Sequence, residues 1–174
     1  MKKQLFVLIL LLCFLVIGSI KGQENQMKII KDEQGNISAK FFFSIFGNDT
    51  LNNGPFIEYY QNGKMKDSCY FERGIRIGIE TFYDNKGRIT FVHEYVGNTF
   101  PREIRTKAFY YSGACRYCEG RMLETTPGNA INHGVVKYYW KNMQLMDSVI
   151  YEKNKEVFRA RFDKNGVIQF ENRY

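Results

Sequence analysis

The sequence predicts an all-β protein: an extended antiparallel β-meander of tandem hairpin repeats in a single curved sheet, preceded by an N-terminal signal-peptide helix. The aromatic content is 16% and the chain has only three prolines, a composition that favours strands. Aromatic residues also recur at a fixed spacing. Tyr60 and Tyr83 are 23 residues apart, and so are Tyr139 and Phe162. Such a period indicates one supersecondary unit repeated along the chain.

Residues 1–22 have the layout of a secretory signal peptide. A positively charged head is followed by an uncharged apolar run from Leu5 to Ile17, which Gly18, Ser19, Lys21 and Gly22 then break. The run is shorter than the roughly 20 apolar residues that a membrane span needs. We therefore expect cleavage after Gly22 and export to the periplasm, the outer surface or the medium. The alternative is an uncleaved N-terminal anchor, because Ile20 is not an ideal residue for the peptidase.

The charge of the exported part argues against a nucleic-acid partner. Loss of residues 1–22 leaves 22 basic and 18 acidic residues, a net charge of +4. No run of five like charges occurs, so the chain has no nucleic-acid-binding tract. The mild excess of positive charge is consistent with weak attraction to an anionic surface.

Residues 54–174 contain the repeats, and residues 23–53 contain N-terminal strands with a degenerate first unit. Each unit has one or two aromatic residues, a polar turn and a second alternating run, and a looser copy surrounds Tyr111. The units begin at Gly54, Gly78, Gly134 and Phe158. The positions expected to maintain the repeat structure are Tyr60, Gly63, Tyr83, Gly87, Tyr139, Phe162 and Gly166.

The turns and the strands of the units are both recognisable. Asn62–Gly63 is a strong hairpin signal because both central residues accept a positive φ. Asn142–Met143 lacks the glycine, so we expect that turn to be weaker or longer. In the strand between turns, Met65, Cys69 and Phe71 share one parity, which predicts one packed face and one wet face. We expect the aromatic residues of neighbouring repeats to stack on each other.

The best unit has Gly54, Tyr59–Tyr60 and Asn62–Gly63–Lys64 in the order Gly-x-aromatic-x-x-Tyr-Tyr-x-Asn-Gly-Lys. It resembles the bacterial variant of the MORN repeat, and similar units cover residues 54–95 and 134–170. The resemblance implies a long, curved antiparallel sheet. Members of the family are often labelled antitoxin-like, and the eukaryotic relatives are described as membrane- or protein-recognition modules. The antitoxin label fits an exported protein poorly.

The exported part has three cysteines, an odd number. Thiols outside the cytosol tend to pair, so one structural interpretation is a Cys115–Cys118 disulfide with Cys69 buried and free; two free thiols are the other. Redox exchange would need a thiolate of low pKa, usually at a helix N-terminus, and the sequence predicts no such helix. A metal site would need Cys69 and His133 as further ligands. We expect neither a metal nor a cofactor.

Two regions are candidates for binding. Segment 119–133 contains Thr125–Asn129, a clear loop signal, and is interpreted as an inserted loop that either carries binding or is a tolerated surface insertion. The densest basic–aromatic region suits phosphate groups, anionic glycans or lipid headgroups, or is a solvated face over a packed one. The region also includes Phe100, Lys107 and Tyr110, and its candidate binding residues are Arg102, Arg105, Phe109, Tyr111, Arg116 and Tyr117.

The sequence offers no catalytic constellation. His93–Glu94 could move a proton, but no nucleophile can be named beside it, so we expect no enzyme. The preferred hypothesis is an exported, non-enzymatic β-repeat scaffold or binding module that meets a protein partner. The alternative is an envelope-associated module that binds membrane lipid or polysaccharide through the basic–aromatic face.

Overall fold

A computed structural model describes residues 24–112 and 115–174, so the predicted signal peptide lies outside the described residues. The described chain forms 13 strands in one antiparallel sheet, which confirms the all-β meander of hairpins. The sheet is open and uncurled, where we had expected curvature. Within the described ranges there is no helix long and apolar enough to cross a membrane.

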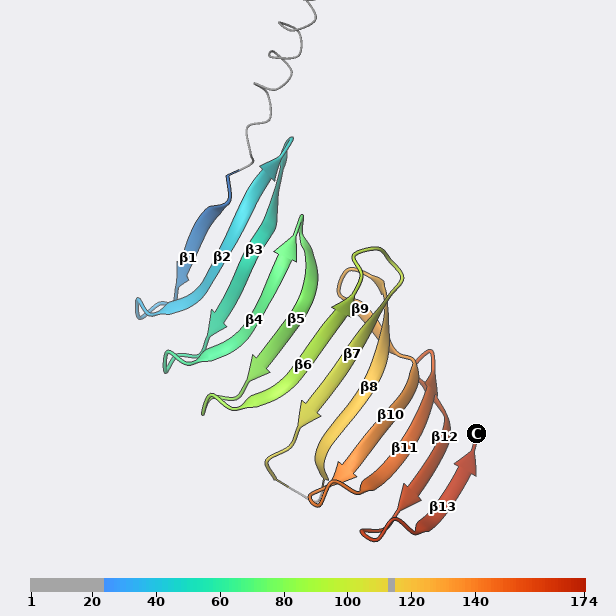
Figure 1. The fold of residues 1–174 in the computed structure, drawn as a ribbon. Helices are drawn as coiled ribbons and strands as arrows, with labels where there is room; N and C mark the ends of the chain where they lie inside the picture. The colour runs from blue at the N-terminus through green and yellow to red at the C-terminus, as the bar shows by residue number, and fades with distance from the viewer. Residues whose placement is uncertain (1–23, 113–114) are drawn as a thin grey trace, which may run out of the picture.

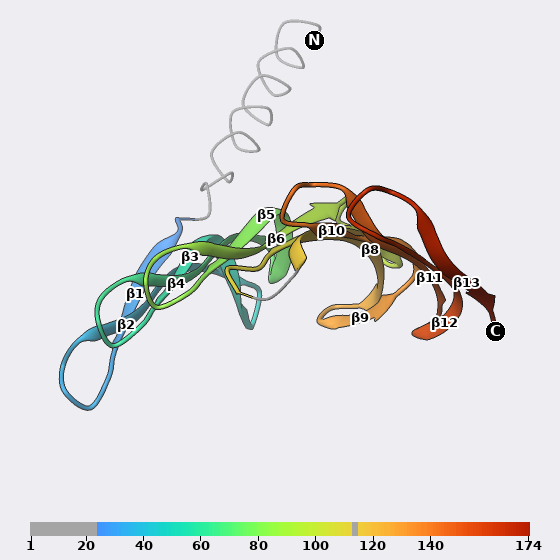
Figure 2. The same cartoon turned by 90° about the horizontal axis from the view of Figure 1, so that it is seen from below.

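The strands follow one another across the sheet almost in the order of the chain (Figure 1). The two ends of the sheet are therefore the first and the last strand, and the turned view shows the strands as a single layer between them (Figure 2). The strands are β1 (Gln26–Lys31), β2 (Ile37–Phe46), β3 (Asp49–Tyr59), β4 (Met65–Glu72), β5 (Ile75–Tyr83), β6 (Ile89–Val96), β7 (Arg102–Phe109), β8 (Cys115–Thr126), β9 (Asn129–Asn132), β10 (Gly134–Trp140), β11 (Leu145–Glu152), β12 (Lys155–Phe162) and β13 (Ile168–Arg173).

Segment 119–133 is not a loop. Most of it is the second half of β8 and the short strand β9, which form a hairpin around Pro127–Gly128. The Gly128 amide donates to Glu124 Oε1 over 2.7 Å and closes this turn. β8 pairs with β7 along its length and with β10 through its first half, whereas β9 pairs only with β8. The expected insertion is therefore a strand extension: β8 continues beyond the end of its pairing with β10, and β9 pairs with that continuation.

The turn at Asn142–Met143 is as tight as the glycine turns. The Met143 amide donates to Trp140 O over 2.9 Å, just as the Gly63 amide donates to Tyr60 O over 2.9 Å. Met143 adopts a φ of 67°, the left-handed region that glycine usually occupies. The prediction of a longer turn was wrong, because the neighbouring strands impose the turn on a residue that disfavours it, and that of a weaker turn stays a prediction.

The register of the hairpins corrects one repeat position. In four hairpins the strand pairing shifts by one residue just before the turn, and the aromatic residue of the repeat lies at that irregularity. Tyr83, Tyr139 and Phe162 occupy this position as predicted, but in the first unit it is occupied by Tyr59 rather than Tyr60. The sequence has adjacent tyrosines there, and only the register distinguishes them.

Hydrogen bonds between neighbouring hairpin tips, rather than stacked rings, connect Tyr60 to the repeat that contains Tyr83. The Tyr60 hydroxyl donates to Tyr83 O over 2.7 Å. The indole Nε1 of Trp140 makes the equivalent bond to Phe162 O over 3.2 Å. The partners are 22 or 23 residues apart in the chain, so each bond joins the tips of two successive hairpins.

Most buried side chains lie on one face of the sheet, which we call the inner face. Residues directly opposite each other in an antiparallel pair lie on the same face, so the register follows this face from β4 to β11. The inner face is packed partly by aromatic rings, such as Phe56 and Phe71 with centroids 5.8 Å apart. Its buried members are Asp67, Cys69, Phe71, Glu80, Arg102, Ile104, Ala108, Cys118, Glu124, Val136, Asp147 and Val149.

Candidate functional site

Arg102, the first residue of the predicted basic–aromatic surface, is buried on the inner face with 4% of its surface exposed. Its Nε lies 2.6 Å from Glu124 Oε2. The guanidinium also lies over the rings of Tyr95 and Phe100, 4.5 and 4.9 Å from their centroids. Arg102 is therefore an internal ion-pair residue, and the interpretation of it as a surface ligand was wrong.

The other five predicted binding residues divide into two groups. Arg105, Phe109 and Tyr117 alternate onto the opposite face of the sheet, which we call the outer face, where the Phe109 and Tyr117 rings are 5.4 Å apart. Tyr111 and Arg116 lie beside the β7–β8 turn. There the guanidinium of Arg116 lies 5.7 Å from the Tyr111 ring centroid. The structure does not bring the six residues together on one surface.

The outer face is hollowed over β6, β7, β8 and β10. This shallow depression, the basic hollow, has a volume of about 630 Å³. Two acidic residues, Glu94 and Glu119, contribute to its lining, against four basic residues. The basic residues are Arg105, Lys107, Arg121 and Lys137.

Glu119 lies between two lysines at the centre of the basic hollow. Lys107 and Lys137 are its cross-strand neighbours on β7 and β10. The two carboxylate oxygens instead accept hydrogen bonds from the hydroxyls of Tyr139 and Tyr117, over 2.8 and 2.9 Å. The Tyr139 hydrogen bond is the largest influence on the Glu119 pKa, which is lowered overall, with further contributions from Tyr117 and the two lysine charges. Both lysines are exposed, and within the described ranges neither has a carboxylate oxygen within 4.0 Å.

The cysteines form neither the candidate disulfide nor the set of ligands that a metal site would need. Cys69, Cys115 and Cys118 are all free, so the Cys115–Cys118 disulfide is absent from the structure. Burial raises the pKa of Cys118 to about 11, which disfavours redox exchange because only the thiolate reacts. Three strands separate Cys69 on β4 from Cys118 on β8, about 19 Å at the usual strand spacing. Cys69 therefore cannot join Cys115, Cys118 and His133 around one ion.

His93 and Glu94 point to opposite faces, as neighbours on a strand do. His93 instead faces Glu80 across the β5–β6 pair, with Nδ1 3.5 Å from Glu80 Oε2. Glu94 is exposed beside the basic hollow. His93 and Glu94 therefore do not share a site.

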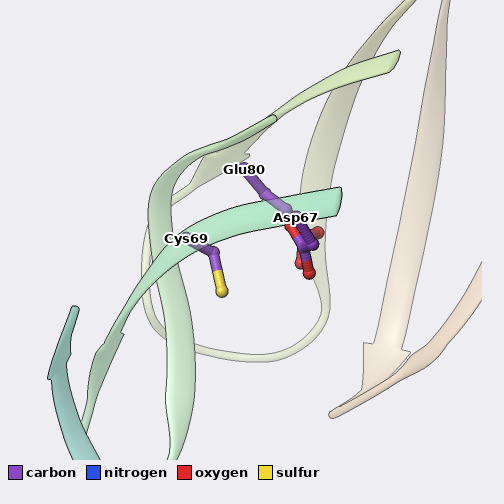
Figure 3. Close-up of side chains that lie close together, drawn as sticks. All are labelled: Asp67, Cys69 and Glu80. Carbon is purple, nitrogen blue, oxygen red and sulfur yellow. The ribbon is translucent and has the colours of Figure 1, made fainter. Parts of the chain in front are cut away.

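Three buried side chains that could bind a metal ion, Asp67, Cys69 and Glu80, come together on the inner face (Figure 3). One donor atom from each lies within 4.8 Å of the others, and all three residues are buried. Asp67 and Cys69 alternate on β4, and Glu80 reaches them from the neighbouring strand β5. We call this group the Asp67–Cys69–Glu80 cluster.

Glu80 is well satisfied within the cluster. Its Oε2 accepts a hydrogen bond from the Tyr95 hydroxyl over 2.6 Å, and its Oε1 lies 2.8 Å from Arg76 Nε. Burial alone would raise the pKa of Glu80, but hydrogen bonds from His93 and Tyr95 and the charge of Arg76 lower it overall. Glu80 is therefore ionised in the folded protein at neutral pH.

Asp67 is poorly satisfied in the same place. Only 7% of its surface is exposed, and its Oδ1 is buried with no hydrogen-bond partner among the described residues. Burial raises the pKa of Asp67 to about 6, and the negative charge of Glu80 adds to the effect. Burial also raises the pKa of Cys69, to about 12. A buried polar atom without a partner costs free energy, so this carboxylate is a feature that requires an explanation.

The sequence around Asp67 recurs later in the chain, so the surroundings of the two equivalent aspartates can be compared. Residues 67–71, Asp-Ser-Cys-Tyr-Phe, recur as residues 147–151, Asp-Ser-Val-Ile-Tyr. Asp147 is likewise buried on the inner face, but Arg161 lies opposite it on the next strand and binds both carboxylate oxygens over 2.9 Å. The residue opposite Asp67 is Phe82. The first copy of the site therefore keeps the carboxylate but has no guanidinium opposite it. The charge of Arg76, which lies 2.8 Å from Glu80, lowers the pKa of Asp67 without offsetting its burial.

Sequence reasoning missed this cluster although a signal was present. Asp67 shares the parity of Met65, Cys69 and Phe71, so the alternation that assigned Cys69 to the packed face also placed a carboxylate there. The sequence contains no comparable signal for Glu80. Its position beside Asp67 and Cys69 depends on the register between β4 and β5, which shifts between Ser68 and Tyr70.

Comparison with known protein families, curated proteins and solved structures finds no match to this chain, so its function must be argued from its own residues.

Proposed function

We propose that this chain is an exported, non-enzymatic β-repeat binding module whose basic hollow binds an acidic segment of a protein partner. The observation that carries the proposal is the pair Lys107 and Lys137. Both ammonium groups lie on the outer face beside Glu119, whose oxygens are already bonded to tyrosine hydroxyls. A partner carboxylate would supply the ion pair that the described residues do not give them.

The scaffold suits such a role. Repeated hairpins with tip-to-tip hydrogen bonds produce a broad sheet, and repeat sheets offer extended surfaces for recognition. The hollow is shallow and lies on a strand surface, which fits an extended peptide better than a small molecule enclosed in a deep cavity. Charge complementarity there would set partner choice and association rate.

The test uses a fluorescein-labelled peptide rich in glutamate and the double variant Lys107→Glu, Lys137→Glu. We expect saturable binding by the unmodified protein, and a loss of at least about tenfold in affinity for the variant, or about 1.4 kcal/mol. Binding should also weaken as salt is raised, since the contact is electrostatic. The measurement is fluorescence anisotropy at two salt concentrations.

A matched control is Lys28→Glu, Lys31→Glu. It changes the net charge by the same amount on the exposed edge strand β1, and we expect it to retain binding. If both variants lose the same amount of affinity, the loss is due to net charge alone and the proposed site is wrong. The same conclusion follows if the peptide does not bind the unmodified protein at low salt.

A second candidate function rests on Tyr111. Its exposed ring has the Arg88 guanidinium 4.1 Å from its centroid and the Arg116 guanidinium 5.7 Å away, a grouping that suits a phosphate or sulfate group on lipid or polysaccharide. Binding to phosphatidylglycerol vesicles or dextran sulfate that is lost in Arg116→Glu, but unchanged in the lysine variant, would favour this envelope-associated role instead.

A further inference from the structure

We infer that Asp67, Cys69 and Glu80 form a zinc-binding site within the sheet. The three donor atoms already lie within 4.8 Å of one another on two adjacent strands (Figure 3). Donors of a tetrahedral zinc ion lie about 3.3 to 3.8 Å apart, given Zn–S near 2.3 Å and Zn–O near 2.1 Å. Side-chain adjustments of about 1 Å would therefore bring the three donors to this spacing, with a water molecule as the fourth ligand.

The orphaned oxygen of Asp67 is placed to bind a cation. Oδ1 is buried without a hydrogen-bond partner in the described part of the chain, although buried polar atoms are nearly always satisfied. At the equivalent position of the later repeat, Asp147 is held by Arg161 on both oxygens. A metal ion in the first copy would take the place that the guanidinium takes in the second.

The charges balance with a divalent ion. Two carboxylates and the Cys69 thiolate carry three negative charges, and Arg76 beside Glu80 carries one positive charge, so a dication brings the group to neutrality. Zinc binding requires the thiolate, and the thiol proton of Cys69 passes to solvent as the Zn–S bond forms. Arg76 remains at the exposed margin, with 39% of its side chain accessible.

The donor set selects the metal. A thiolate combined with carboxylates favours zinc over calcium or magnesium, which take oxygen ligands alone. His93 and Tyr95 contact Glu80 Oε2 at 3.5 and 2.6 Å. They are placed to orient this carboxylate, as residues around bound metals commonly do.

The experiment titrates the reduced protein with Zn²⁺ in competition with a chromogenic chelator, and separately with Co²⁺, whose thiolate complexes absorb in the near ultraviolet. We expect one equivalent to bind and the Co²⁺ complex to show the thiolate absorption. Cys69→Val should abolish that absorption and weaken Zn²⁺ binding more than about 100-fold, beyond the loss typical of an outer-shell residue. Valine is chosen because Val149 occupies the equivalent, buried position in the later repeat, so the fold is expected to be retained.

The control is Cys115→Ser, Cys118→Ser, which removes the other two thiols of the exported part and should leave both signals intact. Asp67→Asn tests the orphaned oxygen and should weaken Zn²⁺ binding while circular dichroism stays unchanged. Absence of stoichiometric binding, or thiolate absorption that survives Cys69→Val but disappears in the double serine variant, would overturn the inference.

Discussion

At the scale of single residues, Asp67 and Asp147 occupy equivalent places in two repeats and meet opposite surroundings. Both are buried on the inner face. Asp147 faces Arg161 at 2.9 Å, whereas Asp67 faces Phe82 and has Glu80 nearby. The same amino acid is therefore neutralised by an ion pair in one repeat and left with an unsatisfied oxygen in the other.

This contrast gives a pH prediction for the metal-free protein. The pKa of Asp67 is about 6 in the folded state against an ordinary value of 3.8, so the folded state holds its proton more tightly than the unfolded state. The contribution of Asp67 to stability is therefore lost as pH rises from about 4 to 6, by about 1 to 3 kcal/mol. Asp67→Asn should remove this loss. Urea unfolding of both proteins at pH 4.5 and pH 8 measures the difference, because other carboxyl groups contribute equally to both.

Asp147→Asn is the matched comparison. It breaks the paired hydrogen bonds to Arg161 and should destabilise the protein by about 1 to 2 kcal/mol at pH 8, a value reduced because Arg161 is partly exposed. If Asp67→Asn destabilises the protein at pH 8 as much as Asp147→Asn does, the account of the two environments is wrong.

At the scale of single elements, the hairpin turns show how neighbouring strands overrule local preference. Met143 adopts a left-handed φ of 67° at the position where Gly63 has a φ of 78°. The side chain of Met143 is largely exposed, so little packing compensates for the strain. A glycine signal in the sequence therefore predicts a turn reliably, but its absence does not predict a different turn.

Met143→Gly should stabilise the protein by about 0.5 to 1 kcal/mol, because glycine removes the backbone strain at the cost of some unfolded-state entropy. The reciprocal change, Gly63→Met, should destabilise it by a similar amount. Thermal unfolding measures both. A lower melting temperature for Met143→Gly would show that the methionine side chain contributes more than its exposure indicates.

The β8–β9 hairpin is the element that sequence reasoning missed. The loop signal at Thr125–Asn129 marks only the tight turn at Pro127–Gly128, and the polar residues before it obscured the strand. Glu119 and Arg121 point to the outer face while Cys118 and Glu124 are buried on the inner face, so the alternation is present but its inward positions are not uniformly apolar. Glu124 can be buried on the inner face because the Arg102 guanidinium neutralises it, with Nε 2.6 Å from Oε2.

At the scale of the whole molecule, the sheet behaves as a one-dimensional array. Apart from β9, each strand pairs with its neighbours in the sheet, and the two ends of the array, β1 and β13, each have an unpaired edge. All residues of both edge strands are exposed. Stability should therefore vary along the array, as in other repeat proteins.

Hydrogen exchange followed by mass spectrometry tests this gradient. We expect amides of β1 and β13 to exchange first, and those of β7, β8 and β10 last, because these central strands contribute the buried group of Ala108, Cys118 and Val136. Exchange of all strands at one rate would indicate a single cooperative unit. Under the zinc inference, added Zn²⁺ should selectively slow exchange in β4 and β5.

The sequence by itself determined that this protein is a β-hairpin array, because hairpin turns and period-two alternation are local properties that neighbouring residues encode. Tertiary structure alone decided which tyrosine marks the first repeat, that Arg102 is buried, and that Asp67, Cys69 and Glu80 meet. These features depend on register between strands, where a shift of one residue exchanges the two faces. Pairings between strands are set by packing across the sheet, and no short stretch of sequence contains that information.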